Sequence, residues 1–205
     1  IQGFSQIVLA DAGDKLGPQE QELLKKTINA ASRLDRLIQD VLTYTRVTRQ
    51  PVALNRVDVE QLLRQIIDER PELQAPNAEI FVEGRFEPVR GHEASLTQCI
   101  TNLLDNAVKF VAPGRLPRVR IWSEVTDDGI RLWFEDNGIG IPKEAQSRLF
   151  GIFQRVHDDR TYPGTGIGLA IVRKGVERMG GRVGLESAPG AGSTFWFELP
   201  SGEAA

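Results

Sequence analysis

The chain has 205 residues, of which 40% are hydrophobic and 26% charged, so it is long enough for one or two domains with a buried core. Its net charge of −3 gives no electrostatic footprint for nucleic acid, and we expect no nucleic-acid partner. The single cysteine, Cys99, excludes an internal disulfide framework and a cysteine-based zinc site, and its apolar helical context indicates a core residue. No stretch approaches the ~20 apolar residues that span a bilayer. We therefore expect a cytoplasmic chain whose parent reaches a membrane only through segments upstream of Ile1.

Two helices are predicted at the beginning of the chain. Apolar residues at helical spacing predict the first helix from Ile1 to about Asp11. Pro18 is suited to the first turn of the second helix, which extends to about Arg49. The apolar stripe of the second helix steps by fours and threes, as in a coiled coil or bundle, and consists of Leu24, Ile28, Ala31, Leu34, Ile38 and Val41. Because a hairpin encloses such a stripe poorly, we expect a homodimeric four-helix bundle. The alternative is a hairpin that packs only on its own C-terminal domain.

After a short linker at residues 50–52, strands and helices follow without strict alternation. Strands are predicted at 54–57, 78–82, 88–90, 118–125, 130–135, 182–187 and 193–199. Helices are predicted at 58–70, 93–111 and 166–179. This order indicates an α+β sandwich in which the helices cover one face of a mixed sheet. We therefore divide the chain into a helical hairpin at 1–50 and an α/β sandwich at 51–205.

Two glycine-rich segments flank an irregular stretch of the sandwich. The first segment, 136–142, follows a predicted strand and contains Asp136, Gly138, Gly140 and Ile141. The second segment, 164–169, runs into a helix and contains Gly164, Thr165, Gly166, Gly168 and Leu169. Glycines let a backbone approach a ligand closely, and a helix N-terminus favours anions. The spacing is neither that of a P-loop nor that of the dinucleotide fingerprint. We interpret the segments as a nucleotide site with a mobile cover, although glycine clusters can also simply mark turns.

The predicted helix at 93–111 has one apolar and one polar face. The apolar face, expected to pack in the core, consists of Leu96, Ile100, Leu103, Ala107 and Phe110. Asn102, Asn106 and Lys109 project together from the polar face because they are spaced by four and three residues. An amide oxygen can ligate Mg²⁺, and a lysine ammonium is a compact partner for phosphate. The polar face is therefore a candidate Mg²⁺-phosphate site or, alternatively, an ordinary solvated face.

These residues carry a resemblance to sensor histidine kinases. Residues 102–110 resemble their N box, 136–140 their first glycine box, 150–155 their F box, and 164–169 their second glycine box. The boxes stand in family order with family-like spacing. Residues 1–49 resemble the dimerisation and histidine-phosphotransfer domain, and 153–166 are also similar to phytochrome-type kinases.

The resemblance implies a Bergerat ATP-binding fold with ATP and Mg²⁺ as cofactors. It implies that Asp136 hydrogen-bonds the adenine amine and that Lys109 contacts phosphate. It further implies that Asn106 ligates Mg²⁺, with Asn102 supporting the metal or the phosphates. The remaining nucleotide contacts would come from both glycine segments, at Gly138, Gly140, Ile141, Gly164, Thr165, Gly166, Gly168 and Leu169.

The resemblance also implies that residues 142–163 form a lid over ATP. Phe150 and Phe153 would anchor the lid by apolar contact. Arg155 and Arg160 are candidates for contact with the γ-phosphate, the alternative being that they are solvated charges on the lid.

Asn102 separates two activities that share this fold. The related gyrase, Hsp90 and MutL ATPases have at this place a glutamate that deprotonates the attacking water. Asparagine cannot act as a general base. We therefore expect a kinase that holds ATP until a histidine attacks the γ-phosphate, and then passes the phosphate to an aspartate on a response-regulator receiver domain. A hydrolytic ATPase of the same fold is the disfavoured alternative.

The histidine of the family's H box is absent from the sequence. We expect it just upstream of Ile1, which makes this chain a fragment that binds ATP but does not autophosphorylate. His92 and His157 lie outside the helical hairpin, and we expect neither to be the acceptor. The remaining alternative is a dimeric nucleotide-binding interaction module without phosphotransfer activity.

Overall fold

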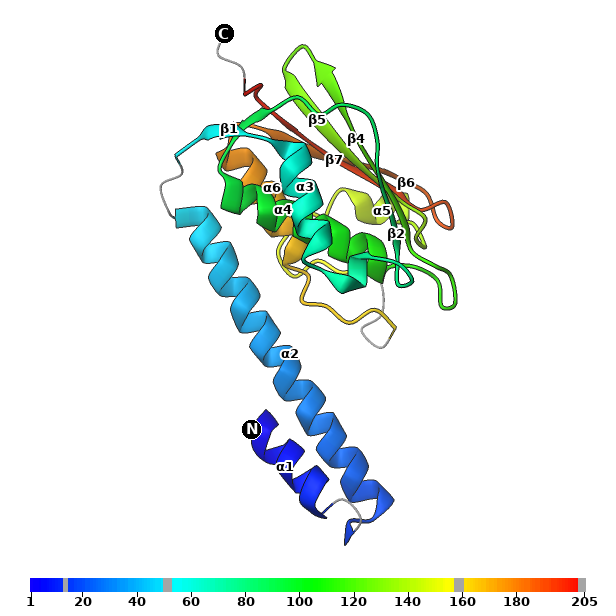
Figure 1. Ribbon diagram of the computed structural model, residues 1–205. Coiled ribbons are helices and arrows are strands. Elements are labelled where there is room, and N and C mark those ends of the chain that lie inside the picture. Colours follow the sequence, from blue (N-terminus) through cyan, green and yellow to red (C-terminus); the bar gives the residue numbers. More distant parts are fainter. Residues whose placement is uncertain (13–14, 50–52, 157–160, 203–205) are drawn as a thin grey trace. The chain divides into compact units, whose positions relative to one another are not determined.

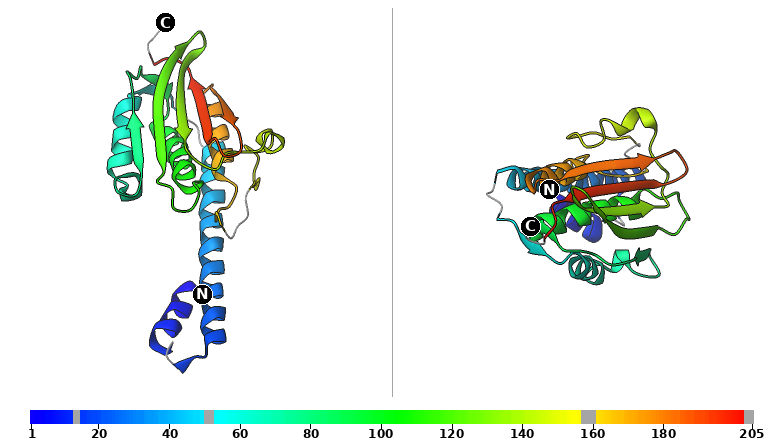
Figure 2. Two further views of the ribbon diagram at one scale, coloured as in Figure 1. Left: turned by 90° about the vertical axis from the view of Figure 1, so that its right-hand side faces the viewer. Right: turned by 90° about the horizontal axis from the view of Figure 1, so that it is seen from above.

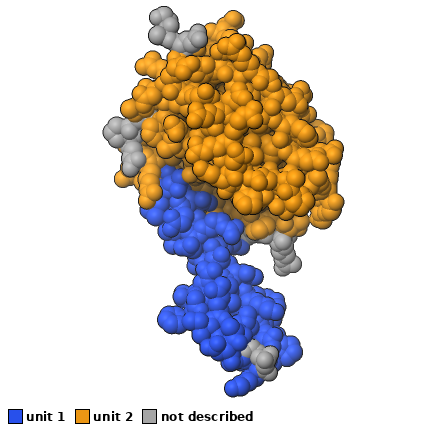
Figure 3. All heavy atoms as spheres, in the orientation of Figure 1, with its two compact units in different colours: residues 1–43 blue, residues 44–205 orange. Residues whose placement is uncertain are grey.

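The computed structural model of the chain describes residues 1–12, 15–49, 53–156 and 161–202. The chain forms two compact units, residues 1–43 and 44–205 (Figure 3). The boundary between these units falls inside the second helix. The division at residue 50 that the sequence predicts follows the end of that helix and stays a prediction about domain function.

The first unit is a helical hairpin. It contains α1 (Gln2–Ala12) and most of α2 (Pro18–Arg49), whose bounds match the predicted helix (Figure 1). Neither helix contains a buried residue, so the hairpin by itself leaves the apolar stripe of α2 in contact with solvent. The exposed large apolar side chains of this unit are Ile1, which precedes α1, and Phe4, Ile7, Val8, Leu23, Leu34, Ile38, Val41 and Leu42 on the two helices. In the described part of the chain, no helix combines the length and the apolar character needed to cross a membrane.

The second unit is built on a mixed five-stranded sheet (Figure 1). The strand order is β2 (Glu79–Val82), β4 (Arg118–Thr126), β5 (Gly129–Asp136), β7 (Ser193–Leu199) and β6 (Arg182–Ser187). β2 runs parallel to β4, and the other neighbouring strands are antiparallel, which includes the two predicted hairpins β4–β5 and β6–β7. A separate antiparallel pair joins β1 (Asn55–Val57) to β3 (Val89–Gly91).

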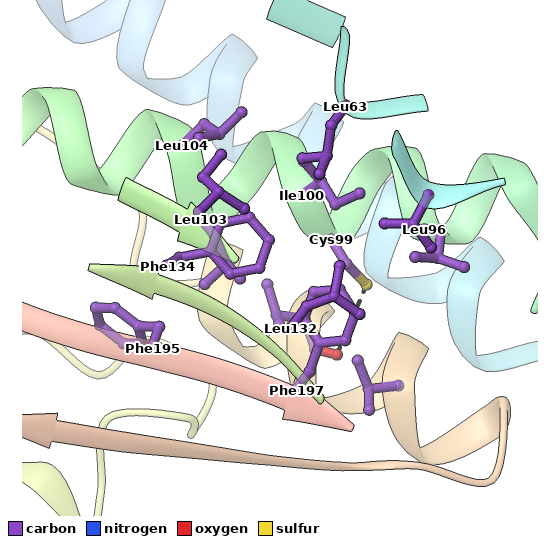
Figure 4. Close-up of a cluster of buried hydrophobic side chains, with 14 of the residues drawn as sticks. Leu63, Leu96, Cys99, Ile100, Leu103, Leu104, Leu132, Phe134, Phe195 and Phe197 are labelled. Atoms are coloured by element: carbon purple, nitrogen blue, oxygen red, sulfur yellow. Dashed lines mark hydrogen bonds between the residues drawn. The ribbon is translucent and has the colours of Figure 1, made fainter. Parts of the chain in front are cut away.

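Three helices form the second layer, and the predicted α+β sandwich is confirmed (Figure 2). α4 (Glu93–Lys109) and α6 (Gly168–Arg178) pack on the sheet, and α3 (Val59–Asp68) packs beside α4. The core between the layers joins apolar side chains of α4 to those of β5 and β7 (Figure 4). Its labelled members are Leu63, Leu96, Cys99, Ile100, Leu103, Leu104, Leu132, Phe134, Phe195 and Phe197.

Cys99 lies within this core, as the sequence predicts. Its side chain is 1% exposed, and its thiol faces the backbone carbonyl of Val172 on α6, with 3.8 Å between sulfur and oxygen. Burial raises the pKa of the thiol to about 12, so the reactive thiolate does not form at neutral pH. Cys99 is therefore a packing residue.

The face of the sheet opposite to the helices carries a row of tryptophans. Trp122, Trp133 and Trp196 stand at paired positions of β4, β5 and β7. The ring centroids of the first two are 5.8 Å apart and nearly parallel, and those of the last two are 6.0 Å apart. The guanidinium of Arg131 lies over Trp196, 4.4 Å from its ring centroid, and is ion-paired with Glu198. These side chains cover each other, so the row is half-buried.

The structure differs from the predicted elements at a few boundaries. α3 ends at Asp68 rather than near Arg70, because the residue before Pro71 disfavours helical geometry. A short 3₁₀ helix, η2 (Pro71–Leu73), follows instead. α6 begins at Gly168, two residues later than predicted, because Gly166 has a left-handed φ of +74°. A one-turn helix, α5 (Lys143–Gln146), was not predicted.

Removing one large core side chain should destabilise the second unit strongly. Phe197 is fully buried and stacks on Phe134, with 5.6 Å between ring centroids. We expect Phe197→Ala to lower the free energy of unfolding by about 4 kcal/mol, measured by chemical denaturation. Val125→Ala is the control, because Val125 is 69% exposed, and its effect should stay within about 0.5 kcal/mol. A similar loss for both variants would contradict the described core.

Candidate functional site

Asp136 is a buried carboxylate at the end of a strand. Its side chain lies on the same helix-covered face of β5 as that of Phe134, two residues earlier, and is 8% exposed. Its Oδ1 accepts hydrogen bonds from the backbone N–H groups of Gly138 (2.8 Å) and Ser193 (3.1 Å). Burial raises its pKa from 3.8 to about 6, although these two hydrogen bonds oppose the shift. A carboxylate held in this way is oriented to accept a hydrogen bond from a ligand amine.

The first glycine segment is fixed against the end of α4. A Cβ atom on Gly138 would lie 2.5 Å from the carbonyl oxygen of Phe110 and 2.7 Å from Asp136 Oδ1, so only glycine fits there. The N–H of Ile139 donates to the same Phe110 carbonyl at 2.9 Å. The segment therefore connects the carboxylate directly to the helix that carries Asn102, Asn106 and Lys109.

The β6–β7 hairpin holds the first glycine segment from the other side. The N–H of Ile141 donates to Ser187 Oγ at 2.9 Å, and Ser187 Oγ donates to the carbonyl of Gly192 at 2.7 Å. Gly140, between the two anchors, has a left-handed φ of +71°. Sequence reasoning missed Ser187 and Ser193 as supports of the site. The available signal was two small polar residues at the facing ends of a predicted hairpin.

The polar face of α4 contains two asparagines whose amide groups lack protein partners. The Nδ2 atom of Asn102 is buried without a hydrogen bond. Among the described residues, no hydrogen bond involves the side chain of Asn106 either. A buried amide nitrogen without a partner is costly, so Asn102 is suited to a ligand, and the half-buried Asn106 amide one helical turn away remains available to the same ligand. Across the described residues, no three His, Cys, Asp or Glu side chains gather as metal ligands, so a divalent cation here would depend on amide and ligand oxygens.

The second glycine segment lies beside this polar face. A Cβ atom on Gly164 would be 2.6 Å from Lys109 Nζ, and one on Gly168 would be 3.3 Å from Asn102 Oδ1. No side chain caps the N-terminal end of α6, which begins in this segment. Phosphates bind well at such helix ends because the backbone N–H groups there lack helical partners.

Two more residues predicted for the second glycine segment have local roles in the structure. The N–H of Ile167 donates to Thr165 Oγ1 at 3.4 Å, which keeps the hydroxyl at the start of α6. Leu169 packs on the hydrophobic core and is half-buried. The structure thus brings together both glycine segments and the polar face of α4, although Leu169 supports the core.

The predicted lid segment, 142–163, is held by one of the two phenylalanines predicted to anchor it. Phe150 packs on the core and meets the edge of Phe195, with 6.4 Å between ring centroids. Leu149 beside it is 8% exposed. The anchoring predicted for Phe153 is wrong: its side chain is 58% exposed. The backbone at Phe153 has a left-handed φ of 61° where it crosses Gly166, and this turns the side chain outward.

Of the two arginines predicted to contact the γ-phosphate, the structure describes only Arg155. Arg155 donates to the backbone carbonyls of Gly164 (2.7 Å) and Tyr162 (3.1 Å), so in this structure it braces the lid. Tyr162, which sequence reasoning missed, donates its hydroxyl to the carbonyl of Val111 at 3.1 Å and so ties the lid to the end of α4. Arg160 and His157 lie outside the described residues.

A family profile and several known proteins match the sequence of this chain. The family profile described as histidine kinase-, DNA gyrase B-, and HSP90-like ATPase matches residues 91–203. The chain is 34% identical to the phytochrome-like protein Cph1 of Synechocystis over 203 residues, which cover 98% of this chain and 27% of Cph1. It is 37% identical to the sensor histidine kinase AruS of Pseudomonas aeruginosa over 195 residues, 90% of this chain and 19% of AruS. The chain thus spans less than a third of either relative.

Two solved structures of other proteins also resemble the chain. The crystal structure of full-length ShkA in complex with AMPPNP matches with a TM-score of 0.72 and 30% identity, covering 100% of this chain and 43% of that one. The mycobacterial sensor histidine kinase MprB matches with a TM-score of 0.60 and 29% identity, covering 72% of this chain and 98% of that one.

Asp136 should make stability depend on pH. Its raised pKa means that the folded state keeps a proton that the unfolded state loses between pH 4 and pH 6. Its contribution is therefore fully present below pH 3.8 and is lost as pH rises through about 6. The difference of about two pKa units corresponds to about 3 kcal/mol.

The variant Asp136→Asn isolates the contribution of Asp136 ionisation to the free energy of unfolding, because an amide oxygen can still accept the two backbone hydrogen bonds. At pH 7.5 we expect the ligand-free variant to exceed the wild type in unfolding free energy by up to about 3 kcal/mol. The difference should vanish below pH 4, because both side chains are then neutral. Denaturation of both proteins across this pH range measures it, and a pH-independent difference would contradict the assignment.

Proposed function

Because this chain belongs to the family of histidine kinase-, DNA gyrase B- and HSP90-like ATPases, we propose that it is the ATP-binding catalytic part of a sensor histidine kinase. Its catalytic domain is homologous to those of sensor histidine kinases. The proposed reaction transfers the γ-phosphoryl group of ATP to a histidine and from there to an aspartate on a response-regulator receiver domain. One arrangement carries the proposal: Lys109 and Asn102 lie against the second glycine segment, and the same helix ends against the segment of Asp136.

In the proposed complex, Asp136 accepts a hydrogen bond from the adenine amine. A buried carboxylate fixed by two backbone N–H groups presents an acceptor of set direction, which distinguishes adenine from bases that lack an amine there. Lys109 Nζ and the backbone N–H groups at the start of α6 bind the phosphates. The lid, tied down by Phe150 and Tyr162, covers ATP and keeps water from the γ-phosphate.

The residues on α4 fit a magnesium ion. Asn106 would supply an amide oxygen, and the remaining ligands would be phosphate oxygens and water. Such an ion would neutralise charge on the phosphates. The buried Nδ2 atom of Asn102 is a donor, so it suits a phosphate oxygen better than the metal.

Asn102 also favours the kinase over the hydrolytic ATPase. An asparagine amide cannot take a proton from water, so ATP bound here lacks a general base for hydrolysis. In the transfer step, an imidazole nitrogen forms a bond to the γ-phosphorus, the bond from that phosphorus to the bridging oxygen breaks, and ADP leaves.

The acceptor histidine is proposed to lie outside these 205 residues. His92 has a structural role, because its Nδ1 accepts the backbone N–H of Ser95 at 3.3 Å and caps α4. We also propose that the parent protein is a sensor histidine kinase, that its partner is a response regulator, and that this part of it lies in the cytoplasm. The matched relatives, a phytochrome-like protein and a sensor histidine kinase, support this proposal.

Calorimetric titration with Mg²⁺-ATP tests the site. We expect the wild-type chain to bind with a dissociation constant in the micromolar to millimolar range, about −8 to −4 kcal/mol. Asp136→Asn should abolish binding, because the amide cannot offer a carboxylate to the adenine amine. Asp128→Asn is the matched control, since Asp128 lies in the β4–β5 turn and pairs with Arg182. A folded wild-type chain that binds no ATP would refute the proposal.

The hairpin should dimerise through the apolar stripe of α2. Ile38 is 53% exposed in the single chain, and a second copy would bury it in a four-helix bundle. We expect light scattering to give the mass of two chains for the wild type and of one chain for Ile38→Asp. Arg36→Glu, on the opposite face of α2, should remain dimeric. A monomeric wild type at high concentration would contradict this part of the proposal.

A further inference from the structure

Arg70 forms an ion pair with the helix that carries the proposed phosphate contacts. It lies between α3 and η2, and its Nη2 donates to Glu72 Oε1 at 2.7 Å and to Asp105 Oδ1 at 2.5 Å. Its side chain is 23% exposed, whereas that of Asp105 is 45% exposed. The pair thus joins a connecting segment, distant in the sequence, to the C-terminal part of α4.

Asp105 lies four residues before Lys109 on α4, about one helical turn away. On a helix, an acidic residue four positions before a lysine is in the favourable arrangement for an ion pair. Such a pair would direct the Lys109 ammonium along α4 toward Asp105. In the structure that ammonium instead lies beside Gly164 and 4.4 Å from the ring centroid of Phe110. Asp105 would also place a negative charge near the proposed phosphates.

We propose that Arg70 is a positioning residue for nucleotide binding, which neutralises Asp105 and keeps it from pairing with Lys109. The guanidinium holds the Asp105 carboxylate on the side of α4 that faces η2. Lys109 then keeps its position beside the second glycine segment. This inference rests on the proposed phosphate contact of Lys109.

We expect the charge at position 70 to matter more for this role than the packing of its side chain. Nη1 of Arg70 is buried without a hydrogen-bond partner, which costs stability. An apolar side chain of similar size would cover the same surface without this cost. The guanidinium pairs with two carboxylates at once, those of Glu72 and Asp105, and of these only Asp105 lies on α4 near Lys109.

A mutant cycle tests the proposal, with the affinity for Mg²⁺-ATP measured by calorimetry. We expect Arg70→Gln to weaken binding about fivefold, the effect of one unfavourable charge contact. Adding Asp105→Asn should restore the affinity of the wild type, because no carboxylate is then available to Lys109. Arg70→Lys keeps the positive charge and should bind within about twofold of the wild type. In the Lys109→Met background, Arg70→Gln should cause no further loss.

Thermal unfolding of each variant separates this role from a structural one. A structural anchor predicts that Arg70→Gln lowers the melting temperature and leaves the ATP affinity of the folded protein unchanged, which would overturn the inference. Failure of Asp105→Asn to restore affinity would overturn it too, as would an equal loss in Arg70→Lys. If Arg70→Gln does not fold, Arg70→Lys and the Arg70→Gln/Asp105→Asn double variant decide. A wild-type chain that does not bind ATP refutes the proposed function instead.

Discussion

The buried carboxylate of Asp136 is the constraint on which the second unit depends. A charge at the end of a core strand is unfavourable, and two backbone N–H groups, those of Gly138 and Ser193, partly offset its cost. Both donors have to approach closely, which requires glycine at 138 and fixes the start of β7 beside the end of β5. The fold thus accepts a locally unfavourable group and surrounds it with rigid supports, a pattern expected where a side chain is kept for a ligand.

α4 connects this carboxylate to the rest of the site. Its apolar face is held in the core, and its end receives the N–H of Ile139 through the carbonyl of Phe110. The polar face then meets the second glycine segment through Asn102 and Lys109. Because one rigid helix contacts both segments, the distance between the adenine end and the phosphate end of the proposed site is set by the core.

Much of this arrangement could be predicted from the sequence, since local patterns determine it. The bounds of α2, the β4–β5 and β6–β7 hairpins and the polar stripe of α4 all follow from periodicity and turn residues. The errors lie where distant segments meet. The outward turn of Phe153 depends on its crossing with Gly166, and the position of Arg155 depends on the carbonyls of the lid. The support from Ser193 arises only when β7 pairs with β5. No periodicity in a single segment contains these contacts.

The row of tryptophans provides an intrinsic fluorescence probe of the sheet. All three tryptophans of the chain stand on β4, β5 and β7, and the helical hairpin contains none. Tryptophan fluorescence therefore reports on the second unit alone. The nearly parallel rings of Trp122 and Trp133, with centroids 5.8 Å apart, are close enough for their electronic transitions to interact. Unfolding of the sheet can thus be followed by fluorescence in an unlabelled sample, without a tryptophan signal from the helical hairpin.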